Sequence, residues 1–378
     1  MSNTDYKQIN WKQGMSVSSA HFIATENFLL ERVLKNSALL QDRFSYGLLP
    51  IESDSDSSME LSVVGTNEYA KLVLNSYHGI TQGGYLIDFE SDNDAVSCPC
   101  EVDGVVSEEG WDVVLSVSPF DRNPCGEPNM QENPPRYPYV APSYKLYIVA
   151  RDKSYVNQYG PYDVVVGFLR KRDTSYKLDP SFIPPSLTMR SSDGLRSMMK
   201  MFSKSIATIK NSLDVIMEKA YVQAENNNRT NVMINILEVC KELQRSLSSM
   251  FFKWHNYGMS LSPYQVVEII SGLASAVSTT LIFFKKSDKE EILKYFYEWN
   301  GIQPSAFEQI LADLTVAEFQ QNRISDSLAL AEKVLKMLEE LLVSLSRLDY
   351  VGQHKESIVI GVKETEKTSN NKTSWLEL

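Results

Sequence analysis

Apolar and polar residues alternate at the start of the chain and then change to a helical spacing. The apolar residues of the alternating segment are Ile9, Trp11, Met15 and Val17. Gly14 is placed for a kink or bulge between them. From Ser18 or Ser19, either of which suits a helix N-cap, apolar residues recur every three or four positions as far as Ala38. The pattern predicts an extended arm and an amphipathic helix, whose apolar side must be covered by the rest of this half or by a neighbouring subunit.

A strand-like pattern follows from about residue 61 to residue 172. Short segments rich in Val, Ile, Leu and Tyr are separated there by clusters of Gly, Asn, Asp and Pro. The predicted strands are 61–64, 70–75, 85–89, 113–117, 144–150 and 164–169. This spacing predicts a β-sandwich.

Two connections in this region are long. Residues 52–59 form an Asp/Ser tract too polar to pack, and we expect it to be exposed or disordered. Residues 119–142 contain seven prolines, and because proline has no backbone N–H this segment cannot be an inner strand. Loops of that length often contact a partner, and a surface insertion explains the segment equally well.

The composition changes at 182–187, and the rest reads as helix. The predicted helices are 193–225, 230–254, 263–284, 289–300, 304–314 and 317–347. Thr230 is the expected N-cap of the second, and Pro263 occupies the first turn of the third. Ser287 and Glu290 have capping-box spacing, and Gly301 has the position of a left-handed helix end.

The last predicted helix carries a long apolar stripe. Its members are Leu328, Val334, Leu335, Leu338, Leu341, Leu342, Leu345 and Leu348. Their mixed three- and four-residue steps are typical of helix bundles and coiled coils. The expected class is therefore α+β, an N-terminal β-sandwich followed by an α-helical bundle, with an arm and helix at 1–50, the sandwich at 51–182, the bundle at 183–350 and a strand (357–362) and tail at 351–378.

Composition and charge narrow the function. The chain has 378 residues and a formal charge of -11, and its basic residues are scattered, which argues against nucleic-acid binding. The first thirty residues do not have the pattern of a signal peptide, and the apolar stretch 266–284 contains Glu268 and many small polar residues, so we interpret it as a buried helix. Four cysteines do not make a disulfide framework, and the reducing cytoplasm is the expected location.

The sequence nominates no catalytic constellation. Phosphate-binding loops, nucleophile elbows and zinc-protease motifs are all missing from it. Cys98, Cys100 and Cys125 lack the spacing and the nearby His of a zinc site. His21 has no nominated nucleophile and is interpreted as a residue that caps the helix. We therefore expect no enzyme activity, no metal, no cofactor and no small-molecule substrate.

Short motifs at two places resemble a known family. The N-terminal ones consist of Ile9, Trp11, Gly14-Met15, His21-Phe22 and, after the helix, Tyr46-Gly47. The second is Ile183-Pro184-Pro185 with a following Ser-containing helix start. Both resemble TssK, the trimeric baseplate subunit of type VI secretion systems. The sequence departs from that family at Ser19-Ala20, where a Pro-Gln pair is common, and after residue 350, where members continue into a head domain.

The resemblance implies an assembly role. The shell domain would be like the shoulder of phage receptor-binding proteins, the helices would form a homotrimer, and the protein would link the wedge proteins TssF and TssG to the membrane-anchoring complex at the inner face of the cell envelope. Trp11, Met15, His21 and Phe22 are candidates for the wedge contact. We expect Trp11 to belong to the core instead. Candidates for the trimer contact are Leu335, Leu338, Leu342 and Leu345.

Two other functions stay open. A phage or contractile-tail receptor-binding protein would share the shell and the trimer, but should end in a β-rich carbohydrate-binding tip. A hydrolase built on the sandwich would require a pocket with clustered acid and base groups. The sequence offers neither feature, and the C-terminal head that the resemblance would require is expected to be absent or reduced to a stub.

Overall fold

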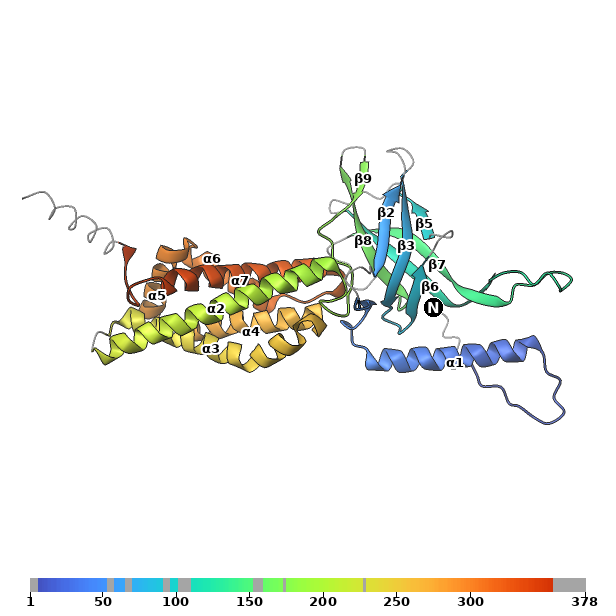
Figure 1. Ribbon diagram of the computed structural model, residues 1–378, viewed down its shortest axis with the longest axis horizontal. Coiled ribbons are helices and arrows are strands. Elements are labelled where there is room, and N and C mark those ends of the chain that lie inside the picture. Colours follow the sequence, from blue (N-terminus) through green and yellow to red (C-terminus); the bar gives the residue numbers. More distant parts are fainter. Residues whose placement is uncertain are drawn as a thin grey trace, which may run out of the picture. The chain divides into compact units, whose positions relative to one another are not determined.

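The computed structural model describes residues 6–52, 58–64, 70–90, 96–100, 110–151, 159–172, 175–226 and 229–355 (Figure 1). The chain divides into two compact units. The N-terminal unit comprises Met1–Ser197, Met259–Tyr264 and Phe319–Ser325, and the helical unit comprises Met198–Gly258, Gln265–Glu318 and Asp326–Leu378. The predicted C-terminal strand at 357–362 lies outside the described residues.

The N-terminal unit takes in segments that the sequence pattern assigned to the bundle. The Met189 N–H donates to the Leu261 carbonyl over 2.8 Å. The side-chain amide of Gln321 donates to the carbonyls of Tyr46 (2.9 Å) and Ser186 (3.0 Å). Backbone groups of the first unit are therefore satisfied by two chain segments that return to it between helices, which a composition change cannot reveal.

Helix α1 (Ser19–Leu40) follows an arm that has no strand assignment. The predicted N-cap is confirmed at Ser18. Gly14 has φ +80° and sits in a turn closed by the Met15 N–H and the Lys12 carbonyl, which confirms the predicted kink. The alternating apolar pattern of the arm therefore does not form a strand within the described residues.

Two antiparallel sheets form the body of this unit. In the first, β1 (Gly47–Leu48), β2 (Met59–Val64), β4 (Leu86–Glu90) and β5 (Val96–Pro99) all pair with the long β3 (Lys71–Ile80). The second has the order β7 (Tyr139–Ala150), β6 (Trp111–Cys125), β8 (Asp163–Arg172), β9 (Ser175–Leu178). The sequence pattern missed the short strands β1, β5 and β9.

The two sheets share one core, which confirms the sandwich. Buried side chains come from the first sheet (Leu72, Leu74, Tyr77, Ile87) and from the second (Val113, Leu115, Val164, Val166, Leu169). At Gly167 a Cβ would lie 2.7 Å from the Leu61 side chain, so the sheets approach closely there. Burial of apolar surface stabilises a fold by roughly 25 cal/mol per Å², so this shared core holds the two sheets together.

The proline-rich segment is partly strand, in a way the sequence pattern did not predict. Strand β8 pairs with β6 only from Trp111 to Ser116, while β6 and β7 continue beyond it and pair again from Asn123 to Cys125. Figure 1 shows this two-stranded hairpin extending past the other strands. The prolines are tolerated because the extension is a ribbon with open edges and not the interior of a sheet.

The helices confirm the predicted bundle. They are α2 (Asp193–Glu225), α3 (Asn231–Tyr257), α4 (Pro263–Phe283), α5 (Lys286–Asn300), α6 (Pro304–Val316) and α7 (Ile324–Ser346), with short 3-10 helices at Gly258–Ser260 and Gln321–Arg323. Thr230 caps α3 by accepting from the Met233 N–H over 3.2 Å, and Gly301 ends α5 with φ +71°.

Two of the predicted helix starts were wrong. Helix α5 begins at Lys286, before the expected cap at Ser287. Helix α7 begins at Ile324, because residues 317–320 are not helical and a 3-10 turn (Gln321–Arg323) follows them. Phe319 in this stretch packs edge-on against Phe44, with ring centroids 5.3 Å apart. Helix α4 is long and apolar enough by composition to cross a membrane, and 44% of its most apolar window is buried within the fold.

Candidate partner-binding surface

His21 fixes the start of α1. The Ser18 N–H donates to His21 Nδ1 over 3.2 Å, and Ser18 Oγ lies 3.0 Å from the same nitrogen. One turn on, the Thr25 hydroxyl donates to the His21 carbonyl over 2.9 Å. A ring nitrogen that accepts from a backbone N–H carries no proton, so the ring takes the place of the carboxylate in a capping box. The predicted capping role is confirmed.

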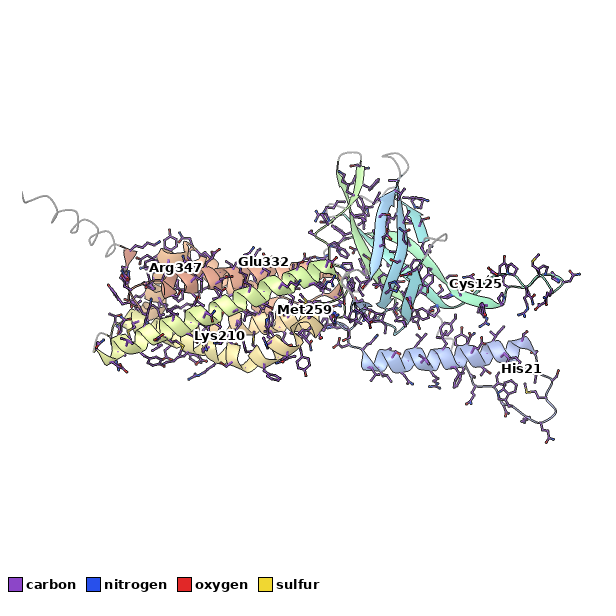
Figure 2. All side chains as sticks on the ribbon, in the orientation of Figure 1. His21, Cys125, Lys210, Met259, Glu332 and Arg347 are labelled. Atoms are coloured by element: carbon purple, nitrogen blue, oxygen red, sulfur yellow. The ribbon has the colours of Figure 1, made fainter. Side chains whose placement is uncertain are left out.

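Aromatic rings gather at this helix start, which Figure 2 marks at His21. The ring of Trp11 lies 6.0 Å from that of His21 and 6.4 Å from that of Phe22. Trp11 is 48% exposed and Phe22 is 58% exposed, whereas Met15 is half-buried. The expectation that Trp11 belongs to the core was wrong, because its ring packs beside His21 and Phe22 at the start of α1, is about half exposed and is not part of the sheet core.

Helix α1 contributes little to the core. Leu34 is the one fully buried residue of this helix. The helix backbone packs against Gly84, where an added Cβ would lie 3.0 Å from the Leu34 carbonyl oxygen. The opposite face presents Leu29, Val33 and Leu40 to solvent. Exposed apolar groups in such a row are uncommon on a protein that works alone. The sequence-based expectation that something covers the apolar side of this helix is met in part within the chain, because Ile23, Phe28 and Leu30 are half-buried and Leu34 is buried.

The β6–β7 hairpin is attached to both the arm and α1. The rings of Tyr6 and Phe120 are 4.7 Å apart. The Arg122 guanidinium donates to the Glu26 carboxylate over 2.7 Å. The hairpin also carries exposed apolar side chains, which are Met130, Tyr137, Tyr139 and Val140. Arm, α1 and hairpin form one apolar and aromatic surface, which we call the arm surface. Sequence reasoning flagged the proline-rich segment but none of these side chains.

The four predicted trimer-contact leucines do not lie on a surface. Leu335, Leu338, Leu342 and Leu345 are each at most 3% exposed within the helical unit. Leu338, Leu342 and Leu345 line its interior together with side chains of four other helices, including Cys240, Val277, Phe296 and Phe307. This corrects the prediction, because a side chain enclosed by its own bundle is not available to another copy. The periodicity identified the apolar side of α7 but not what covers it.

The motif residues at the domain junction meet in space. Tyr46 donates its hydroxyl proton to the Asn322 side-chain oxygen over 3.1 Å, and burial raises the pKa of Tyr46 to about 12. The Leu48 carbonyl accepts from the Ser191 hydroxyl over 2.9 Å, and the Leu48 N–H donates to the Pro185 carbonyl over 2.8 Å. The Tyr-Gly and Pro-Pro motifs therefore have a structural role, whereas Trp11 and Phe22 are free to act on the surface.

The described residues hold no group of three or more His, Cys, Asp or Glu that could bind a metal ion. The ring nitrogens of His78 on β3 lie 2.6 Å from Asp88 and 3.3 Å from Glu90, both on the neighbouring strand β4, and both carboxylates are largely exposed. Burial raises the pKa of the Cys98 thiol to about 11 and that of Cys240 to about 12. Both cysteines stay protonated near neutral pH and are poor nucleophiles.

The chain folds into two compact units, and comparison with known proteins shows which structures it is similar to. No family model and no curated protein matches the chain. Among solved structures, it is similar to a crystal structure of TssK, with 17% identity over 89% of this chain and 70% of that chain and a TM-score of 0.44. It is also similar to a chain of the type VI secretion system TssK-TssF-TssG baseplate subcomplex, with 15% identity over 88% and 99% of the two chains and a TM-score of 0.42.

Proposed function

We propose that the protein is a non-enzymatic structural component of a type VI secretion baseplate, in the position that TssK occupies. One observation carries the proposal: the arm and α1 present Trp11 and Phe22 to solvent, within the motif that resembles that family. Aromatic side chains that protrude from a rigid element are the usual anchors of protein interfaces. The buried motif residues Tyr46 and Gly47 hold the fold, so exposure separates the interacting part of the motif from the structural part.

The partner of the aromatic part of the arm surface, at the start of α1, is a wedge complex of the TssF and TssG type. Trp11 and Phe22 are the anchors, and Met15, which is half-buried in the arm, is a further apolar residue of the contact. His21 acts through its cap, which keeps the first turn of α1 and therefore the Phe22 ring in place. A contact built from a few large apolar groups needs no catalytic or metal chemistry.

Three further parts of the proposal follow from the resemblance. The protein associates as a homotrimer, it acts in the cytoplasm at the inner face of the cell envelope, and it connects the wedge to the membrane-anchoring complex. The acidic composition, with a formal charge of -11, agrees with protein partners and not with nucleic acid.

Co-purification tests the wedge contact. The full chain and a TssF/TssG-type complex are mixed and separated by gel filtration with light scattering. We expect the wild-type chain to co-elute with the wedge and the double variant W11A/F22A to elute apart from it. The matched control is Phe283→Ala, which removes a ring 82% exposed on α4 of the helical unit, and it should co-elute like the wild type. A wild-type chain that ignores the wedge, or a control that fails like the double variant, would count against the proposal.

A further inference from the structure

The exposed face of α1 has the form of a helical ligand. Leu29, Val33 and Leu40 are 56%, 59% and 89% exposed. With Asn36, which is also exposed, they occupy positions i, i+4, i+7 and i+11 and therefore lie along one side of the helix. At 1.5 Å per residue the row is about 16 Å long. This row starts seven residues beyond Phe22 and can act separately from the aromatic cluster.

The helical unit carries an apolar groove of about 450 Å³ on its surface. Its lining comes mostly from α3 (Gln244, Leu247, Ser248, Phe251, Phe252, His255, Asn256), with Lys210 of α2. Figure 2 marks Lys210 on that helix. Phe252 is 73% exposed, and the ring of Phe251 stacks on His255 with centroids 6.2 Å apart. Lys210 is neutralised by Asp214 at 2.9 Å.

Two features of the groove match the α1 row. The lining on α3 extends over three helical turns, so the groove is about 18 Å long, close to the length of the row. The side-chain oxygen of Gln244 is buried and has no hydrogen-bond partner among the described residues, while the Gln244 amide N–H donates to Asp214 over 3.2 Å. An unsatisfied acceptor beside an apolar groove calls for a donor, and Asn36 brings an amide N–H in the middle of the apolar row.

We infer that the Leu29–Val33–Leu40 face of α1 in one copy lies in the α2–α3 groove of a second copy of this chain. The occupant is a second copy because one chain carries both halves of the contact, matched in length and in apolar character. Binding of an amphipathic helix in an apolar groove is a common recognition mode. The inference deepens the proposed self-association and rests on that part of the proposed function.

The two halves of the contact lie on different surfaces, so the contact is head-to-tail. Such contacts either close into a ring or continue as a filament. A ring of three copies gives the proposed homotrimer three identical contacts. It also leaves Trp11 and Phe22, which precede the α1 row, free for another partner.

Light scattering of the full chain tests the contact with two single variants. Val33→Glu places a charge on the α1 row, and Phe252→Glu places one in the groove. We expect the wild type to have a mass three times that of the 42.9 kDa chain, and each variant alone to be monomeric. Mixing the two variants is the decisive step: the intact α1 of the Phe252→Glu chain should bind the intact groove of the Val33→Glu chain and give a two-chain species.

The control is Phe283→Glu, which adds the same charge to an exposed ring outside the groove and should keep the wild-type mass. Circular dichroism confirms that every variant retains its helices, as expected for exposed positions. A monomeric wild type, single variants that keep the wild-type mass, or a mixture that does not recombine would each overturn the inference. Co-elution with the wedge is measured separately, so failure of the α1 contact and failure of the proposed wedge role are distinguished.

Discussion

Gly47 and Pro185 are in such close contact that a Cβ at position 47 would lie 2.1 Å from the carbonyl carbon of Pro185. Gly47 also has φ +116°, a conformation that L side chains rarely adopt. The chain passes directly over the Pro-Pro segment here, and Leu48 pairs with Ser186 as an isolated parallel bridge. Two motifs separated by almost 140 residues in the sequence therefore require each other.

Gly47→Ala should destabilise the N-terminal unit severely. The strained backbone alone costs about 1–3 kcal/mol, and the overlap with Pro185 adds to that cost because the atoms it meets are backbone atoms. Urea denaturation followed by circular dichroism measures the loss. Gly272→Ala is the matched control: this helical glycine has nothing within 4 Å of an added Cβ, and alanine there should be neutral or stabilise by up to about 1 kcal/mol. Equal effects at the two sites would refute the contact.

Leu342→Ala should lower the free energy of unfolding of the helical unit by about 2–5 kcal/mol, since it leaves a cavity among buried side chains. Leu39→Ala changes the same side chain at a position 83% exposed, and its effect should stay within about 0.5 kcal/mol. Thermal denaturation of the two variants compares them directly. A mild effect at Leu342 would mean that this leucine stripe is not the bundle core.

Asp112→Ala should cost about 3–5 kcal/mol, because it removes a buried carboxylate that is paired with the largely buried Arg151 guanidinium. Asp112 accepts from Arg151 Nε over 2.8 Å and from the Tyr159 hydroxyl over 2.7 Å. The guanidinium carbon also lies 3.8 Å from the centroid of the Phe168 ring. Because an apolar chain suits that place, the double variant D112A/R151M should recover much of the loss in urea denaturation. If the single and the double variant are equally unstable, the charge pair is not the cause.

The protein should lose stability as the pH rises above 9. Burial raises the pKa of Cys240 from 9.0 to about 12, so above pH 9 its thiol ionises in the unfolded chain but not in the folded one. This one group removes about 1.4 kcal/mol of stability per pH unit between 9 and 12. Tyr46 adds to the loss above pH 10.

Urea midpoints at successive pH values measure this slope. Cys240→Ala should make the fall between pH 9 and pH 10 shallower, while Cys98 and Cys100, whose pKa values are also raised by burial, keep part of it. An unchanged slope in the Cys240→Ala variant would show that this thiol titrates alike in the folded and the unfolded chain.

Trp11→Ala should leave the unfolding free energy within about 0.5 kcal/mol of the wild type, because the ring is about half exposed and lies outside the sheet core. Wedge co-elution should nevertheless be weakened by the same change. A large loss of stability in denaturation would return Trp11 to a structural role.

Much of the fold could be read from local patterns. The N-caps at Ser18 and Thr230 begin their helices, and the left-handed Gly301 ends one, where the sequence predicts, because these effects act within one turn. Central strands such as β6 and β8 were found for a similar reason, since a buried strand needs a run of branched apolar residues. Strands β1 and β9 were missed, because two to four residues are too few for a period to show.

The sequence by itself determined which residues form helices and strands and which side of each is apolar, because propensity and periodicity are properties of neighbouring residues. Only the tertiary structure decided what covers those sides. It enclosed Leu342 and its stripe in the bundle of one chain, left Trp11 and the α1 row in solvent, and closed Gly47 over Pro185. These outcomes depend on contacts between segments far apart in the chain, and no local pattern records them.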